Sequence, residues 1–296
     1  MPRSQRGKNL KRHQAIGVKI LNSDFLVATV QMTSVDQIEN NLLQIENIVQ
    51  QIFASASPQL VCFPENCLYL RVVEGEKIEG MDITHPAFIR LAKLAEKNNT
   101  HLHLGSVPLQ MPGGLYNSSI LIKPTGEILP TYQKIHLFDI QLENQAPIRE
   151  SDVFCHGAST HIIEIDGWRI GQTICYDLRF AELFSIYARK EVDLILVPAA
   201  FLVKTGEAHW HILLRARAIE SQAYVVASAQ GGTHIGKEQK TRETYGHSLV
   251  VDPWGLILDE IEAPRMGYTI TKLTRDRLKQ VRKQIPMSSH RRIHHS

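Results

Sequence analysis

Three chemically reactive side chains each follow an apolar, strand-like run in this 296-residue sequence. Glu65 closes LVCFPE, Lys134 stands in YQKIHLFD and Cys175 closes RIGQTIC. A cysteine thiol is only weakly ionised near neutral pH, so a nucleophilic Cys175 needs a base or a strong positive field. Glu65 could accept the thiol proton, and Lys134 could stabilise an oxyanion together with the backbone N–H after the cysteine. The three residues therefore predict a site for acyl transfer.

Each of the three residues also has an ordinary structural explanation. A free cysteine in a strand more often packs in the core than reacts, and a strand-end glutamate or a surface lysine is common in any protein. A glutamate at the end of a buried run is nevertheless costly unless it is paired or protonated, which makes Glu65 informative. The combination favours a reactive site over three independent structural residues.

Alternating apolar runs and helix-period segments must position these residues. Residues 25–32 (FLVATVQM) predict a buried strand, and residues 38–52 place apolar side chains at three- and four-residue steps, which is typical of an amphipathic helix. Without a linker or a repeat, the pattern predicts one α/β domain whose functional groups collect where strands end. The other expected elements are helices at 86–97, about 179–191 and about 209–223, strands at 101–109, 193–201, 224–230, 246–255 and 267–274, and hairpins turning at 124–126 and 166–167.

Composition and charge exclude several classes of protein. Hydrophobic residues make up 43% of the chain and charged residues 21%, and no apolar run is long enough to span a membrane. This predicts a soluble globular protein without a membrane partner. The formal net charge of +3 is small for this length, and the basic residues gather at the two ends, so we expect no nucleic-acid partner.

The two ends and the cysteines bear on the cellular context. Residues 1–23 are basic and lack the apolar core of a secretory signal, so we expect a flexible basic tail, with an organellar presequence as the alternative. We expect residues 24–285 to form the folded domain and residues 286–296 a C-terminal tail. The cysteines are too scattered for a disulfide framework or a paired metal site, which predicts a cytoplasmic protein. They are Cys62, Cys67, Cys155 and Cys175.

Three motifs resemble those of one family. The segments FPEN (63–66), YQKIHLFD (132–139) and ICYDLRFAEL (174–183) are similar to the triad contexts of the nitrilase superfamily of carbon–nitrogen hydrolases, in the same order. Two longer blocks, residues 205–230 and 245–255, extend the resemblance over nearly the whole chain. The resemblance implies a four-layer αββα sandwich and an enzyme without a cofactor that cleaves amides or nitriles through a cysteine thioester.

The resemblance also implies a role for individual residues. It implies Glu65 as general base, Lys134 as the group that positions the reactants and stabilises the oxyanion, and Cys175 as nucleophile. It places the second glutamate of the family at Glu150, although the loop NQAPIRES around it departs from the glycine-rich segment of relatives. The alternative for Glu150 is a surface-loop carboxylate. Tyr176, directly after the cysteine, is expected to contribute its backbone N–H to the oxyanion site.

Within the family, the sequence resembles the branch that contains omega-amidase and deaminated glutathione amidase. Both act on a short amide whose acyl part carries a carboxylate, so a cationic anchor is expected near the cysteine. Arg179 could hold that carboxylate with its guanidinium fork, or could instead pair with Asp177 or Glu182. Asn117 is a candidate substrate-binding amide of the pocket, with a turn or core hydrogen bond as its alternative.

The fourteen histidines do not predict a metal site. No HExxH motif occurs, and the pairs His101/His103 and His209/His211 lie two residues apart. The family block that contains His209 is expected to pack around the mouth of the pocket. The resemblance also implies a homodimer or a higher homo-oligomer, with the C-terminal tail covering a neighbouring subunit.

Several alternatives to the hydrolysis of a carboxylate-bearing amide stay open. A nitrilase or a general aliphatic amidase would use the same triad. A papain-type hydrolase would need a histidine beside Cys175, and a binding module would keep the fold without turnover. Product analysis separates nitrile from amide hydrolysis, and a slowly reacting Cys175 thiol would favour the binding module.

Overall fold

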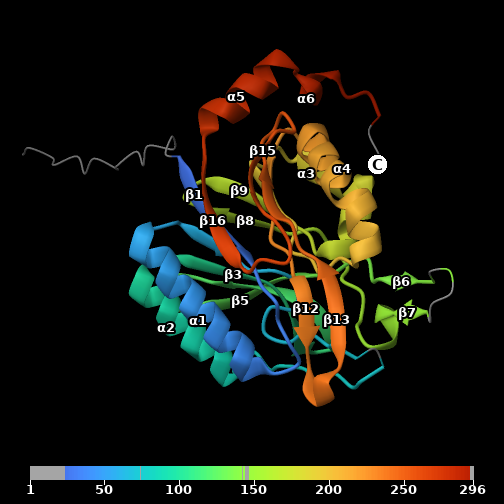
Figure 1. Cartoon of the computed structure of the whole chain (residues 1–296). Helices are drawn as coiled ribbons and strands as arrows, with labels where there is room; N and C mark the ends of the chain where they lie inside the picture. Colours follow the sequence, from blue (N-terminus) through green and yellow to red (C-terminus); the bar gives the residue numbers. More distant parts are fainter. Residues whose placement is uncertain (1–23, 74, 142, 144–146, 294–296) are drawn as a thin grey trace, which may run out of the picture.

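The computed structural model describes residues 24–73, 75–141, 143 and 147–293. The flexible tail predicted for residues 1–23 lies outside the described residues. The described chain forms two stacked six-stranded sheets with helices on their outer faces (Figure 1). No described helix is both long and apolar enough to cross a membrane.

The first sheet joins the two ends of the described chain. Three neighbouring strands, β1, β2 and β3, run parallel, and β16 pairs antiparallel with β1, so that Phe25 lies opposite Leu273. In order across the sheet, the strands are β16 (Gly267–Leu273), β1 (Phe25–Gln31), β2 (Leu60–Cys62), β3 (His101–Met111), β4 (Gly114–Ile122) and β5 (Ile128–Gln133).

The second sheet repeats this plan with a parallel centre. Strands β9, β10 and β11 run parallel, and antiparallel strands complete both sides. In order across the sheet, the strands are β15 (Ile257–Ile261), β14 (Ser248–Val251), β11 (Tyr224–Ala227), β10 (Leu194–Leu196), β9 (Trp168–Gln172) and β8 (Ile162–Ile165). The hairpins expected at 124–126 and 166–167 are present as β4–β5 and β8–β9.

Strand alternation divides the core into three layers. Ala28 packs with helices α1 (Ile38–Ser55) and α2 (Pro86–Asn98), whereas its neighbour Val27 faces the second sheet. In the second sheet, Ile195 packs with helices α3 (Ala181–Arg189) and α4 (Val203–Ser221), whereas Leu194 faces the first sheet. Both sheets are thus buried on both faces, as parallel strands require. This arrangement confirms the predicted four-layer αββα sandwich.

Some elements were not predicted, or begin elsewhere than predicted. Helix α4 begins at Val203, six residues before the expected start, and includes Gly206. The ring of Tyr245 occupies the space that a Cβ at Gly206 would need. A glycine in the sequence disfavours a helix at that position, but this helix needs a glycine here because no side chain would fit. The hairpin of β12 (Gly231–Ile235) and β13 (Thr241–Tyr245), with the turn η3 (Lys237–Gln239) between them, belongs to neither large sheet and was not predicted.

Short elements complete the described chain. Helix α6 (Met287–His290) falls inside the expected C-terminal tail, where Arg291 donates to the backbone oxygen of Glu220. The place of this tail at a subunit interface stays a prediction. The remaining elements are β6 (Asp139–Ile140), β7 (Ile148–Arg149), η1 (Glu150–Asp152), η2 (Cys175–Arg179), α5 (Arg275–Gln284) and α6 (Met287–His290).

Candidate functional site

The three sequence-predicted triad residues meet where strands of the two sheets end. Glu65 follows β2, Lys134 directly follows β5, and Cys175 stands three residues beyond β9. All three line one pocket, although almost 70 residues separate Glu65 from Lys134 and about 40 separate Lys134 from Cys175. The structure therefore brings together the residues that the sequence pattern grouped.

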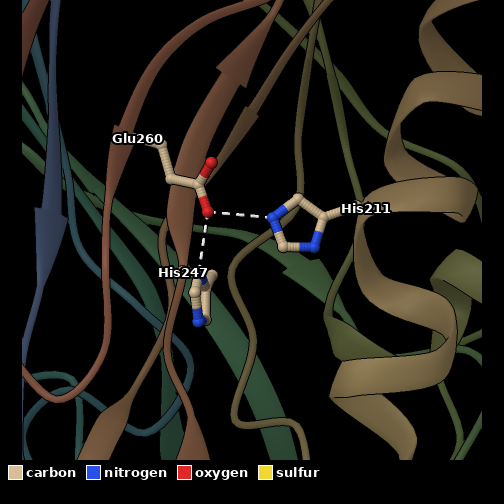
Figure 2. Close-up of side chains that lie close together, drawn as sticks. All are labelled: His211, His247 and Glu260. Carbon is tan, nitrogen blue, oxygen red and sulfur yellow. Dashed lines mark hydrogen bonds and ion pairs between the residues drawn. The ribbon is translucent and has the colours of Figure 1, made fainter.

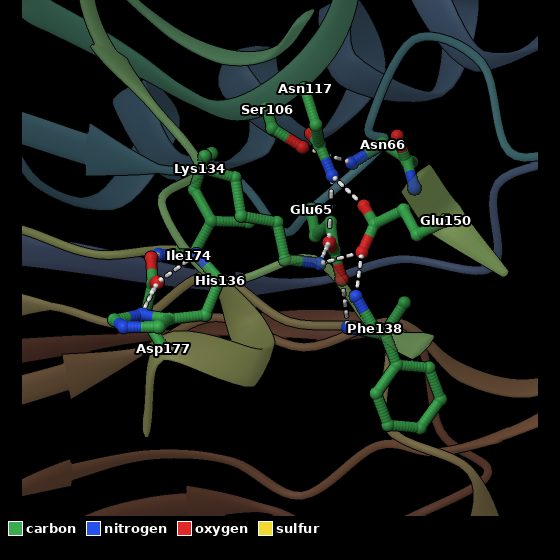
Figure 3. A network of polar contacts seen from close by, with 12 residues as sticks. Glu65, Asn66, Ser106, Asn117, Lys134, His136, Phe138, Glu150, Ile174 and Asp177 are labelled. Carbon is green, nitrogen blue, oxygen red and sulfur yellow. Dashed lines mark hydrogen bonds and ion pairs between the residues drawn. The ribbon is translucent and has the colours of Figure 1, made fainter. Parts of the chain in front are cut away.

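A buried lysine lies between two carboxylates (Figure 3). Lys134 Nζ is 2.9 Å from Glu65 Oε1 and 2.7 Å from Glu150 Oε2. The side chains of Lys134, Glu65 and Glu150 are 2%, 4% and 13% exposed. Burial alone would lower the pKa of Lys134, but the charges of Glu150 and Glu65 outweigh burial and hold it well above its usual value. Lys134 is therefore a fixed positive charge at the floor of the pocket.

Amide groups hold the two glutamates in place around this lysine. Asn117 Nδ2 donates to Glu65 Oε1 at 3.0 Å and to Glu150 Oε1 at 2.9 Å (Figure 3). The backbone N–H of Ala200 donates to the other oxygen of Glu65, and that of Phe138 donates to Glu150. Each carboxylate therefore has several donors, which is the condition for keeping a buried charge.

Asn117 differs from its predicted role in substrate binding. Its side chain is fully buried, and it is absent from the residues that line the pocket, because it lies behind the two glutamates and donates to both. This is the core hydrogen bond that the sequence left as the alternative. Asn117 is therefore a positioning residue that fixes Glu65 relative to Glu150.

Cys175 has an unusual backbone conformation, and its thiol is a neighbour of Glu65. Cys175 has a φ of +48°, in the left-handed region that a side chain seldom adopts, and its N–H donates to Pro198 O at 2.8 Å. Burial and the charge of Glu65 raise the pKa of the thiol well above its usual value, against the opposite effect of Lys134. The resting thiol is therefore protonated, with a carboxylate beside it.

The residue after the cysteine offers an unused donor. Tyr176 is the second residue of the turn η2, where backbone N–H groups lack helical partners. Within the described parts of the chain, no acceptor takes the Tyr176 N–H. The Tyr176 ring lines the pocket and packs edge-on against Phe138 and Phe180.

Asp177 joins the cysteine turn to the lysine strand, and sequence reasoning missed this role. Its fully buried carboxylate accepts hydrogen bonds from the Tyr132 hydroxyl at 2.8 Å and from the Ile174 N–H at 2.9 Å. It also contacts the ring and the backbone N–H of His136, two residues beyond Lys134. An aspartate inside the apolar motif ICYDL must be paired if it is buried, and that signal could have identified it.

The pocket has an aromatic and a cationic wall. It encloses about 740 Å³, part of it open to solvent, and includes the rings of Phe138, Tyr176 and Phe201. Arg179 lies 5.8 Å from the Tyr176 ring centre and 5.2 Å from that of Phe201, and Nη1 is 3.0 Å from a ring nitrogen of His209. Among the described residues, Arg179 has no carboxylate partner, so the alternative salt bridges to Asp177 and Glu182 do not form. Its charge is available to a ligand.

A second polar cluster lies away from this pocket, between α4, β15 and the segment before β14 (Figure 2). Glu260 Oε1 is 2.9 Å from His211 Nε2 and 2.7 Å from His247 Nδ1. One potential ligand atom from each of these three residues lies within 4.8 Å of the others, a spacing that suits a metal ion. The side chains are 23% to 30% exposed, and the two imidazoles already occupy the carboxylate oxygen.

Comparisons with known proteins agree with the fold. A family model described as carbon-nitrogen hydrolase matches residues 26–283. The chain is 37% identical to a Synechocystis protein named deaminated glutathione amidase, over 90% of this chain and 98% of that protein. It is 34% identical to the human protein of the same name, over 90% of this chain and 82% of that protein.

Solved structures give the same result. The NitFhit protein of Caenorhabditis elegans superposes with a TM-score of 0.77 at 32% identity, over 92% of this chain and 66% of that chain. Nit3 of Saccharomyces cerevisiae, described as a member of branch 10 of the nitrilase superfamily, superposes with a TM-score of 0.76 at 27% identity, over 92% of this chain and 98% of that chain. The family match spans the strand ends that carry Glu65, Lys134 and Cys175.

Proposed function

Because the chain belongs to the carbon–nitrogen hydrolase family, it is an amidase that hydrolyses carbon–nitrogen bonds other than peptide bonds, and we propose that its substrate is a small linear amide with a carboxylate on its acyl part. Relatives from bacteria and eukaryotes that carry the name deaminated glutathione amidase support this substrate class. The omega-amide of an alpha-keto acid belongs to the same class and is included in the proposal.

The observation that carries the proposal is the buried Glu65–Lys134–Glu150 network on the floor of the pocket that also contains Cys175. A protonated thiol is a poor nucleophile, so the reaction needs a base at the moment of attack. Glu65 is that base, because it is buried beside the thiol and its orientation is fixed by Asn117 and Ala200. Within the described chain, no histidine lines the pocket, which disfavours a Cys–His hydrolase.

Acylation follows from these positions. Glu65 takes the thiol proton while the sulfur of Cys175 bonds to the amide carbon. The negative charge that develops on the carbonyl oxygen is stabilised by Lys134 and by the N–H of Tyr176, which are in place before the reaction. Protonated Glu65 then gives its proton to the nitrogen, the carbon–nitrogen bond breaks, and ammonia or an amine leaves. The acyl group remains on the sulfur as a thioester.

Deacylation uses the same base. A water molecule loses a proton to Glu65 as its oxygen bonds to the thioester carbon, the carbon–sulfur bond breaks, and the proton returns to the sulfur. The carboxylic acid is released and the resting thiol is restored. Glu150 takes part by holding Lys134 at 2.7 Å. Arg179, in the same turn as Cys175, binds the carboxylate of the acyl part.

A substrate panel tests the proposal. Release of ammonia or amine is measured with deaminated glutathione, 2-oxoglutaramate, butyramide and butyronitrile. We expect turnover of the two carboxylate-bearing amides and little of the other two compounds. If butyramide is hydrolysed fastest, the protein is a general aliphatic amidase. If butyronitrile is hydrolysed fastest, it is a nitrilase. No turnover of any compound would favour a binding module.

A further inference from the structure

The pocket carries more positive charge than its catalytic network needs. Four cationic side chains and two carboxylates line it, and Lys134 already contacts both carboxylates. Two other arginines of the lining, Arg179 and Arg242, take no part in that network. The proposed function gives Arg179 a carboxylate to bind. It assigns nothing to Arg242, which lies on the hairpin β12–β13, outside both large sheets.

Arg242 is placed to bind a ligand as well as to hold the hairpin. Its side chain is half-buried, and Nη1 donates to the backbone oxygen of Arg71 at 3.0 Å. A guanidinium has five N–H donors in a fixed fork, so this bond leaves most of them available. Among the described residues, Arg242 has no carboxylate partner. The adjacent Glu243 is exposed and contacts Thr233 instead.

A half-buried guanidinium without a counter-charge is costly unless something else compensates it. The bond to Arg71 anchors the Arg242 side chain and so reduces the entropy that a ligand would have to remove. Carboxylates match the guanidinium fork in a bidentate way. A carboxylate is therefore the ligand chemistry that this wall of the pocket favours.

We propose that Arg242 binds a second carboxylate, carried on the amine side of the scissile amide. The acyl part stays on Cys175 in the thioester and is held by Arg179, which shares its turn. The amine part departs as the thioester forms, so its anchor need not belong to that turn. The preferred substrate then has a carboxylate at each end, with the reacting amide between them. This inference rests on the proposed function and narrows its substrate class.

Paired substrates and paired variants test the inference. Deaminated glutathione is compared with its C-terminal glycinamide analogue, which differs only in the amine-side carboxylate. We expect the wild type to prefer the acid. Arg242→Met should lower the ratio of kcat/KM for the acid to kcat/KM for the glycinamide by on the order of 10-fold to 100-fold, through KM. Arg242→Gln, which keeps a donor for Arg71, should lower that ratio comparably.

Control variants and substrates separate the possible outcomes. Lys240→Met removes one charge from the same hairpin at a residue outside the pocket lining and should leave the ratio unchanged. If Arg242→Gln lowers kcat/KM equally for both substrates, Arg242 is structural and the inference is overturned. A wild type that does not distinguish acid from glycinamide also overturns it. If the wild type hydrolyses 2-oxoglutaramate but does not distinguish the acid from the glycinamide, only this inference is overturned. If it hydrolyses none of these amides, the proposed function is overturned as well.

Discussion

Two clusters in this protein use similar groups in opposite arrangements. In the pocket, one lysine lies between two carboxylates (Figure 3), and on the outer layer, one carboxylate lies between two imidazoles (Figure 2). Their contact distances are nearly the same, between 2.7 and 2.9 Å. They differ in burial, because Lys134 and Glu65 are almost inaccessible whereas His211 and Glu260 are about one quarter to one third exposed.

Burial decides what each cluster can do. In the pocket, water cannot compete for the charges, so a carboxylate beside a neutral thiol can move one proton and a fixed lysine can stabilise an oxyanion. In the outer cluster, water screens the charges and replaces lost partners, so the cluster contributes little beyond a local tie between α4 and β15. Composition alone does not distinguish catalytic groups from structural ones.

The largest expected effect is on the nucleophile. Cys175→Ala should lower kcat by more than about 10⁴-fold, because no other group can form the thioester, while the thermal unfolding midpoint changes little. Amine release and thermal melts measure the two effects. Cys62→Ala is the matched control, because Cys62 is also buried but lies in the core between the sheets. Near-normal turnover by Cys175→Ala would contradict the whole mechanism.

The next largest effect compares the carboxylates of the two clusters. Glu65→Gln should lower kcat by about 10²- to 10⁴-fold, because the amide cannot accept the thiol proton. Glu260→Gln makes the same chemical change in the outer cluster and should leave kcat unchanged. Steady-state kinetics on the two purified variants measure kcat. Equal losses of kcat in both variants would contradict the proposed difference between the two clusters.

Stability should show the same contrast. Lys134→Met leaves Glu65 and Glu150 buried without their shared cation, and should lower the free energy of unfolding by about 3–5 kcal/mol. Because the pKa of Lys134 is raised on folding, this stabilisation is fully present below the usual lysine range and is lost only as the pH rises through the folded-state value. Urea unfolding measures the effect. An unchanged unfolding free energy would mean that the contacts of Lys134 with Glu65 and Glu150 add nothing to stability.

The smallest effect is expected from the outer cluster. Burial would raise the pKa of Glu260, but hydrogen bonds from His211 and His247 outweigh burial and hold it below its usual value. The contribution to stability is therefore present above the usual carboxyl range and is lost as the pH falls through the folded-state pKa. Glu260→Gln should cost about 1 kcal/mol or less at neutral pH and less still in acid. Urea unfolding of the wild type and of Glu260→Gln at neutral pH and at acidic pH tests this. A loss of unfolding free energy that is larger in acid would contradict the stabilising role of the Glu260 carboxylate.

The strands, the helices and the grouping of the triad residues could be predicted from local signals, whereas the four-layer arrangement was implied by the family resemblance. Buried strands give apolar runs, and Glu65, Lys134 and Cys175 stand directly after such runs. Asn117 and Asp177 were harder to assign, because their roles depend on which carboxylate or strand lies opposite in space. A polar residue shows only that it needs a partner, not which partner it has.

Arg242 left no signal in the sequence. It lies in a short polar strand, TRETY, whose pattern resembles an exposed loop, and it reaches the pocket only because the hairpin β12–β13 packs beside the segment after Glu65. The early start of α4 was hidden for a similar reason, because the ring that fills the space at Gly206 comes from Tyr245, almost 40 residues later. Long-range packing of this kind overrides local propensity.

The antiparallel pairing of β1 with β16 has a consequence for biosynthesis. Roughly 250 residues separate Phe25 from its partner Leu273, and at about 5–20 residues per second the ribosome takes on the order of 10–50 s to synthesise that distance. Throughout this interval, one edge of the apolar strand β1 lacks its neighbour and can pair with another nascent chain. The first sheet is therefore completed only after Leu273 has been synthesised, and β1 is the segment that a chaperone would have to shield until then.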